Sequence, residues 1–211
     1  DRNGQPLAVN AVGRDVVINM AYMGDTPVNE VIQRLIGVMK QAGEGWIDNL
    51  PITQQAPFRF LDEEAYATQI DRLKRAVDAQ PYATAEDVCA LLREKYGLEE
   101  LDDTRFRQVA GVRYEMEQRG FNMRTPYTFA TNIRMETVPQ IKEQGYRLPG
   151  VDVVETPIRQ YVSGDIAPHL IGQVGPLYAE QWNAAEKEMT PDGTVVAHIG
   201  DHTYLMYDSI G

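Results

Sequence analysis

Near the end of the chain lies the segment Arg159-Gln-Tyr-Val-Ser-Gly-Asp-Ile-Ala-Pro-His-Leu-Ile-Gly-Gln-Val-Gly175. It combines an arginine, an aromatic residue, a histidine and closely spaced glycines with apolar residues between them. The pair Gly172 and Gly175 lacks the third glycine and the lysine that a nucleotide-binding loop requires. The spacing matches no catalytic pattern either, so we expect Gly164, Gly172 and Gly175 to occupy turns or close backbone contacts.

The two charged or titratable residues of this segment also favour a structural role. The planar guanidinium of Arg159 is suited to hold a carboxylate or several backbone carbonyls. His169 has apolar neighbours, which favours a hydrogen-bonded structural histidine over a ligand or a general base.

Length, composition and charge are those of an acidic globular protein. The 211 residues suffice for one large domain or two small ones, with 43% hydrophobic and 24% charged residues. The formal net charge is −11 and the pI is near 4.7. Nucleic-acid binding needs stripes of Lys and Arg, so this charge argues against a nucleic-acid partner.

The single cysteine, Cys89, excludes an internal disulfide and any multi-cysteine metal site. It falls in an apolar stripe with Val88 and Leu92, which predicts a small buried residue. No apolar run approaches the ~20 residues that span a bilayer. Because the chain has a single cysteine and no nucleotide-binding loop, we expect no cofactor and no metal.

Strand-like segments frame a helical block. The turn signal Arg2-Asn3-Gly4 precedes two expected strands at 7–10 and 15–20. Helix signals follow from Thr26 and Pro27 onward, with Gly43, Gly97 and Gly120 as stops. The expected helices are 27–42, 61–78, 84–96, 103–119 and 134–143, and the later expected strands are 127–130, 151–156, 194–199 and 201–206.

This order predicts an α+β fold. A discontinuous base is expected from residues 1–25 and 121–211, with a mostly helical inserted subdomain at 26–120.

Two motifs together resemble a known family. The opening Asp1-Arg-Asn-Gly-Gln-Pro-Leu-Ala8 and the segment 159–175 resemble the N-terminal, non-catalytic half of class B penicillin-binding proteins, which cross-link bacterial peptidoglycan. That family reads roughly R-G-x-I-x-D-R-N-G-x-x-L-A and later R-x-Y-P-x-G-x-x-A-x-H-x-x-G-x-x-G. The residues shared with it include Arg2, Asn3, Gly4, Arg159, Tyr161, Gly164, His169, Gly172 and Gly175. Val162 stands where the family usually has proline.

Shorter elements extend the resemblance. Arg113-Tyr-Glu115, Leu148-Pro-Gly-Val151 and the closing Asp208-Ser-Ile-Gly211 look like the family's R-Y-E, L-P-G-V and D-x-I-G. The helical insertion and Pro51-Ile52 look more like the elongation-type enzymes than the division-type ones.

The catalytic motifs of that family are missing. Acyl transfer there needs S-x-x-K, S-x-N and K-T-G. The chain has two serines, Ser163 and Ser209, and neither begins S-x-x-K or S-x-N. Lys95-Tyr-Gly97 comes nearest to K-T-G but ends an expected helix. We therefore expect no transpeptidase activity from this chain.

The resemblance implies a pedestal, or dimerisation, domain that positions a transpeptidase domain. It implies a single transmembrane anchor just before Asp1 and a location on the extracytoplasmic face of the bacterial cytoplasmic membrane. The implied partners are the polytopic glycosyltransferase of the shape and division machinery and an extracytoplasmic scaffold protein, and a homodimer is left open.

Two other functions remain open at this point. One is a free-standing module that binds peptidoglycan or another wall polymer. The other is a small zinc hydrolase built on His198, Asp201 and His202, which are spaced somewhat like H-x-x-E-H. The strand-like run before His198 and the intervening Gly200 favour a hairpin instead of the helix that such a zinc site needs.

Overall fold

The computed structural model describes residues 8–161, 175–176, 185–189, 195–199, 202–204 and 209–210. Contacts divide the chain into two units, residues 10–158 and residues 1–9 with 159–211. The predicted division into a base and a helical insertion stays a prediction.

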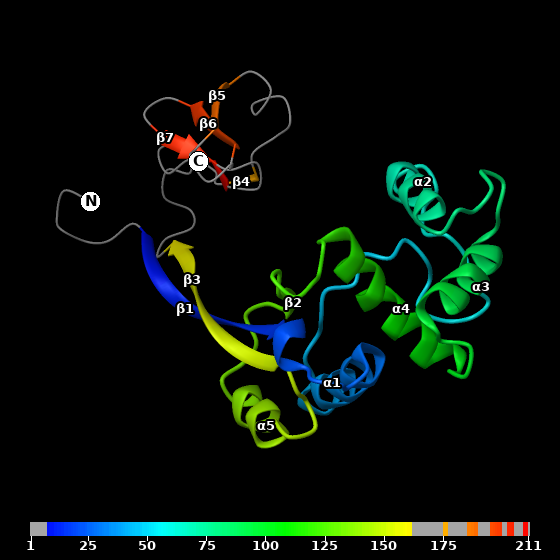
Figure 1. The fold of residues 1–211 in the computed structure, drawn as a ribbon, viewed down its shortest axis with the longest axis horizontal. Helices are drawn as coiled ribbons and strands as arrows, with labels where there is room; N and C mark the ends of the chain where they lie inside the picture. Colours follow the sequence, from blue (N-terminus) through cyan, green and yellow to red (C-terminus); the bar gives the residue numbers. More distant parts are fainter. Residues whose placement is uncertain are drawn as a thin grey trace. The chain divides into compact units, whose positions relative to one another are not determined.

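One strand opens the described part of the chain, a run of four α-helices follows, and strands with one further α-helix make up the rest (Figure 1). This content confirms the predicted α+β class. The elements are β1 (Ala8–Ile18), the 3-10 turn η1 (Met20–Tyr22), α1 (Val28–Ala42), α2 (Ala67–Ala76), α3 (Ala85–Tyr96), α4 (Asp103–Gln118), β2 (Tyr127–Ala130), α5 (Thr137–Glu143), β3 (Val151–Tyr161), β4 (Gly175–Pro176), β5 (Glu186–Met189), β6 (Val195–Ile199), β7 (His202–Tyr204) and β8 (Ser209–Ile210).

A three-stranded sheet in the order β2-β1-β3 holds the first unit together. The expected pair of strands at 7–10 and 15–20 was wrong, because one continuous strand, β1, covers both segments as far as Ile18. Gly13 lies in its middle, where an added Cβ would meet Ile158 Cδ1 of β3 at 2.2 Å. The glycine makes room for a side chain of the neighbouring strand instead of forming a turn.

Local signals placed most helix ends correctly. Thr84 and Asp87 form a capping box at the start of α3, and Gly43 and Gly97 end α1 and α3 in the left-handed conformation. The expected helix 61–78 begins later, at Ala67. Asp62 Oδ1 accepts hydrogen bonds from the amides of Glu64 and Ala65 and so forms a separate turn.

The core of this unit lies between the sheet and the helices. α1 packs against α4 and α5, and α3 packs against α4 (Figure 1). Trp46 stacks on Phe129 of β2 with ring centroids 6.1 Å apart, and Phe58 meets Phe106 of α4 edge-on at 5.7 Å. Cys89 is buried as predicted, and burial raises its pKa to about 12.

The second unit contains two described sheets, β4-β8 and β5-β6-β7. The expected pairing of the strands on either side of Gly200 and Asp201 is confirmed, because β6 and β7 are antiparallel neighbours in which Ile199 pairs with His202. β5 was not expected, since Glu186-Lys-Glu-Met189 has little intrinsic strand preference. Its pairing with β6 is what makes it a strand.

Gly150 tests the close contact between the residue before β3 and the residue after β1. Its φ is +78°, and an added Cβ would lie 2.5 Å from the carbonyl oxygen of Asn19. The same glycine accepts a hydrogen bond from the Asn19 amide at 2.7 Å. We expect Gly150→Ala to lower the free energy of unfolding by about 1–3 kcal/mol in urea titrations. Gly45→Ala, where nothing lies within 4 Å, is the matched control; equal midpoints for the two variants would contradict this role.

Candidate functional site

The described part of the chain contains three of the nine family-motif residues named from the sequence, Arg159, Tyr161 and Gly175. Arg159 is exposed near the end of β3, and Gly175 of β4 pairs with Ile210 of β8. Their structural roles stay predictions. The other six lie outside the described residues: Arg2, Asn3, Gly4, Gly164, His169 and Gly172.

His198 lies on β6 in a sheet, opposite Thr203 of β7. Its Nε2 is 3.4 Å from the Oε2 of Glu188 on β5. Asp201 lies outside the described residues. Within the described ranges no three His, Cys, Asp or Glu side chains converge as metal ligands. A sheet setting does not supply the helical turn that the zinc hypothesis requires.

A buried arginine organises the helical part of the molecule. Arg107 of α4 has a side chain only 1% exposed, and its Nη1 donates to Asp48 Oδ1 and Oδ2 at 3.1 and 2.9 Å. Its Nη2 donates to the carbonyls of Leu50 and Ile52 at 3.0 and 2.9 Å. Its Nε lies 3.2 Å from the carbonyls of Ile52 and Thr53. The guanidinium therefore binds the segment 48–53 to α4.

Sequence reasoning missed Arg107, although one signal was present. Gly111 lies one helical turn later, and an added Cβ there would be 2.5 Å from Asp48 Oδ1 and 2.9 Å from Arg107 Nη1. A glycine in a helix interior, four residues after an arginine, indicates space reserved for a buried group. The identity of the partner, Asp48, is not readable from α4 itself.

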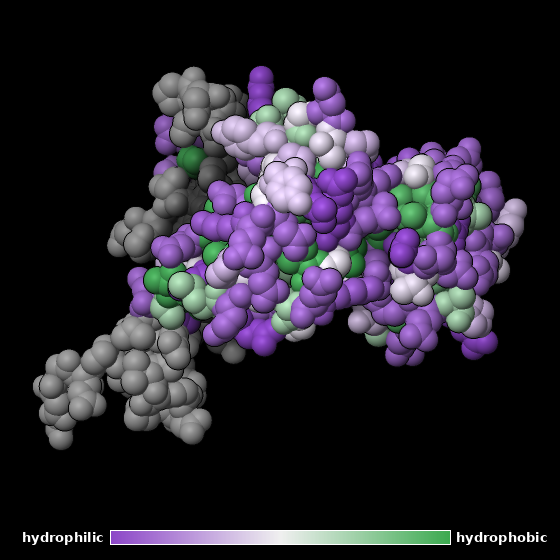
Figure 2. All heavy atoms as spheres, turned by 90° about the horizontal axis from the view of Figure 1, so that it is seen from below, coloured by the Kyte–Doolittle hydropathy of each residue, from purple (hydrophilic) through white to green (hydrophobic). Residues whose placement is uncertain are grey.

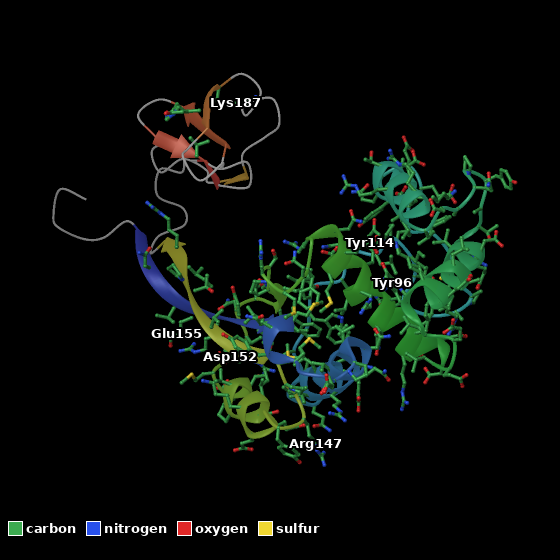
Figure 3. The ribbon with its side chains drawn as sticks, in the orientation of Figure 1. Tyr96, Tyr114, Arg147, Asp152, Glu155 and Lys187 are labelled. Carbon is green, nitrogen blue, oxygen red and sulfur yellow. The ribbon has the colours of Figure 1, made fainter. Side chains whose placement is uncertain are left out.

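A second network joins α3 to α4. Glu117 accepts hydrogen bonds from Lys95 Nζ and from the Tyr96 hydroxyl, both at 2.7 Å, and Figure 3 shows Tyr96 among the side chains between these helices. Burial opposes ionisation of Glu117, but these hydrogen bonds and the charges of Lys95 and Arg113 outweigh it and hold its pKa below 4.5. Burial and the same carboxylate raise the pKa of Tyr96.

A third network anchors the end of α1. Glu44 accepts from the backbone amide and Nε of Arg134 at 2.9 and 3.0 Å and from the Thr137 hydroxyl at 2.9 Å. Burial opposes the charge on Glu44, yet the bonds from Arg134 and Thr137 lower its pKa. Arg134 also donates to the carbonyl of Ala42. This network therefore connects the C-terminal end of α1 to the segment that leads into α5.

In all three networks the charged groups already form hydrogen bonds or ion pairs within the chain.

The same holds for the lysine of a hollow of about 650 Å³ between the segment 58–63, α2 and the loop 81–85. Its Lys74 donates to the Pro81 carbonyl at 2.6 Å and lies over the Phe60 ring at 5.0 Å. The arrangement fits a structural or binding domain.

Comparison with known proteins identifies the family. Residues 1–200 match the family described as the Penicillin-binding Protein dimerisation domain. The chain belongs to this family, as its two motifs predict, and a role in the cell wall follows from that membership. The family is a non-catalytic dimerisation domain, which agrees with the expectation of no enzyme activity in this chain. No curated protein matches the chain.

Two matching solved structures are penicillin-binding protein 2B from Streptococcus pneumoniae. For strain 5204 the identity is 15% and the TM-score 0.45, with 87% of this chain and 29% of that chain covered. For strain R6 the values are 13% and 0.31, with 99% and 36% covered. This chain therefore spans about a third of the length of those proteins. No helix among its described residues is long and apolar enough to cross a membrane.

Arg107→Leu is expected to lower the free energy of unfolding by about 3–5 kcal/mol, because it removes the cation that pairs with the largely buried Asp48 and leaves the buried carbonyls of Leu50 and Ile52 without their donor. Arg107→Lys keeps the charge but loses the planar guanidinium with its several donors, so the decrease in the free energy of unfolding should be intermediate. Arg105→Leu, on the exposed side of the same helix, should unfold like the wild type. Chemical denaturation measures all three, and a wild-type midpoint for Arg107→Leu would contradict the binding of 48–53 to α4.

The lowered pKa of Glu117 predicts acid sensitivity. A carboxylate whose pKa is lower in the folded state stabilises the fold above its unfolded pKa, and this contribution is lost as the pH falls through the folded value. The wild type should therefore be more stable than Glu117→Gln at pH 7, and the difference should shrink and then disappear as the pH falls below the ordinary carboxyl pKa and through the lower pKa of Glu117 in the folded state. Glu99→Gln, in an exposed turn, is the control. A difference that stays constant with pH, measured by urea midpoints, would refute this assignment.

Proposed function

We propose that this chain is the non-catalytic pedestal of a peptidoglycan-cross-linking penicillin-binding protein. It positions the transpeptidase domain of its parent protein and presents surfaces to other proteins of cell-wall synthesis. The observation that carries the proposal is the family match over residues 1–200. The networks around Arg107, Glu117 and Glu44 support it, since they fix segments of the helical part against one another, as a spacer requires.

The proposed setting follows from the same resemblance. The parent protein is held by a single N-terminal anchor at the extracytoplasmic face of the bacterial cytoplasmic membrane. Its proposed partners are the polytopic glycosyltransferase of the shape or division machinery and an extracytoplasmic scaffold protein. Co-purification of the full-length protein with these partners tests this part, and recovery of the full-length protein without either would count against it.

Labelled penicillin tests the absence of acyl transfer. Since Ser163 and Ser209 lack the lysine and asparagine that activate a nucleophile in this family, incubation with fluorescent penicillin should leave the chain unlabelled. A full-length class B penicillin-binding protein is the positive control. A stoichiometric adduct on either serine, located by mass spectrometry, would overturn the proposal.

The second candidate is a free-standing module that binds wall polymer. An exposed Tyr82 beside the hollow at 58–63 favours it, because aromatic faces pack against sugar rings. A pull-down with purified sacculi separates the two candidates. A pedestal leaves the chain in the supernatant, whereas saturable sedimentation that is lost in Tyr82→Ala would favour the polymer-binding module.

A further inference from the structure

Two neighbouring hollows lie on either side of α1 and share Arg34 and Gly37. One, of about 400 Å³, extends toward α5 and includes Gln144 and Arg147. The other, of about 330 Å³, extends toward α4 and includes Arg105 and Gln108. We call the two together the Gly37 trough. Figure 2 views the side where α1 and α5 lie and shows a largely hydrophilic face.

At Gly37 no side chain covers the helix backbone that forms the floor of the trough. It lies inside α1, where glycine is the least favourable residue after proline. Nothing lies within 4 Å of a Cβ added to it, so packing does not require a glycine here. Gly111 of α4 is the contrast, because a Cβ there would strike Asp48. Because no side chain covers the half-buried backbone at Gly37, another chain can approach it closely.

Cations and amides surround this floor. Residues three and four positions away share a helix face, and for Gly37 they are Gln33, Arg34, Lys40 and Gln41. α4 and the region after α5 add two further glutamines and two further arginines. Among the described residues that line the two hollows there is no Asp or Glu. This is a local reversal of sign in a chain of net charge −11.

Two of the cations have no carboxylate partner in the described part of the chain. Lys40 Nζ donates to Gln108 Oε1 at 2.9 Å, and the Arg147 guanidinium lies 5.3 Å from the ring of Tyr146. Figure 3 shows Arg147 at the lower edge of the view, beyond α1 and α5. The other two are engaged at the rim, Arg34 by Glu30 and Arg105 by Asp102.

We propose that the Gly37 trough binds an acidic peptide segment of a partner protein. The unpaired cations attract its carboxylates, and the glutamine side chains, each with a donor and an acceptor, match its peptide groups. A nucleic acid fits less well, because the cations are separated by amides and the net charge repels a long polyanion. The inference rests on the partner-contact part of the proposed function and adds the surface and the chemistry of the bound segment.

The probe is a short fluorescein-labelled peptide of alternating Glu and Ala, titrated with the 211-residue chain at low salt and followed by fluorescence anisotropy. Binding should be saturable, should weaken as NaCl is added, and should be absent for the peptide of alternating Gln and Ala. Arg147→Gln should raise the dissociation constant about fivefold. Arg124→Gln, which removes the same charge from an exposed turn outside the trough, should leave it unchanged.

Gly37→Leu separates folding from binding. Leucine is a better helix former and meets open space, so the melting temperature should stay equal or rise. The side chain fills the floor, so affinity for the acidic peptide should fall at least about tenfold. Unchanged affinity in Gly37→Leu would overturn the proposal, as would a failure of the acidic peptide to bind. Tighter binding of oligothymidylate would show a polyanion site instead. These outcomes are independent of penicillin labelling, which tests the pedestal role, so the two proposals can fail separately.

Discussion

The ion pair between Arg107 and Asp48 is the contact on which the helical part of the molecule depends. A guanidinium that is 1% exposed is costly unless every donor finds an acceptor. Asp48 and the carbonyls of Leu50, Ile52 and Thr53 supply those acceptors. The amide of the neighbouring Ile47 donates to the Phe129 carbonyl of β2 at 2.9 Å. One buried charge thus links α4, through an irregular segment, to the sheet.

That linkage also bears on the surface proposed to bind a partner. α1 lies between α4 and α5, so the Gly37 trough keeps its shape only while those helices keep their places. Hydrogen bonds to Glu117 connect α3 to α4, and hydrogen bonds to Glu44 connect the end of α1 to the segment before α5. These fixed connections support the proposed pedestal role, and a preformed surface loses little conformational freedom on binding.

Local chemistry made much of the fold predictable. The Thr84–Asp87 capping box, the glycine stops and the strand β2 all follow from residues within a few positions of one another. Non-local effects were not predictable in the same way. β1 is continuous because Gly13 admits Ile158 from a distant strand, and Arg107 finds its partners more than fifty residues earlier. The trough likewise forms only where three separate segments meet in space. The one sequence signal for it is Gly37, a glycine in the interior of a helix, where glycine is unfavourable.

Native-state hydrogen exchange of the unmodified chain tests the central linkage most directly. If Arg107 joins the segment 48–53 to α4, the amides of Ile47 and Thr53, bonded to Phe129 and Arg59, should open together with helix amides such as that of Val109. Their opening free energies should agree within about 1 kcal/mol. Rapid exchange of the segment while α4 remains protected would show an independent loop and would contradict this account.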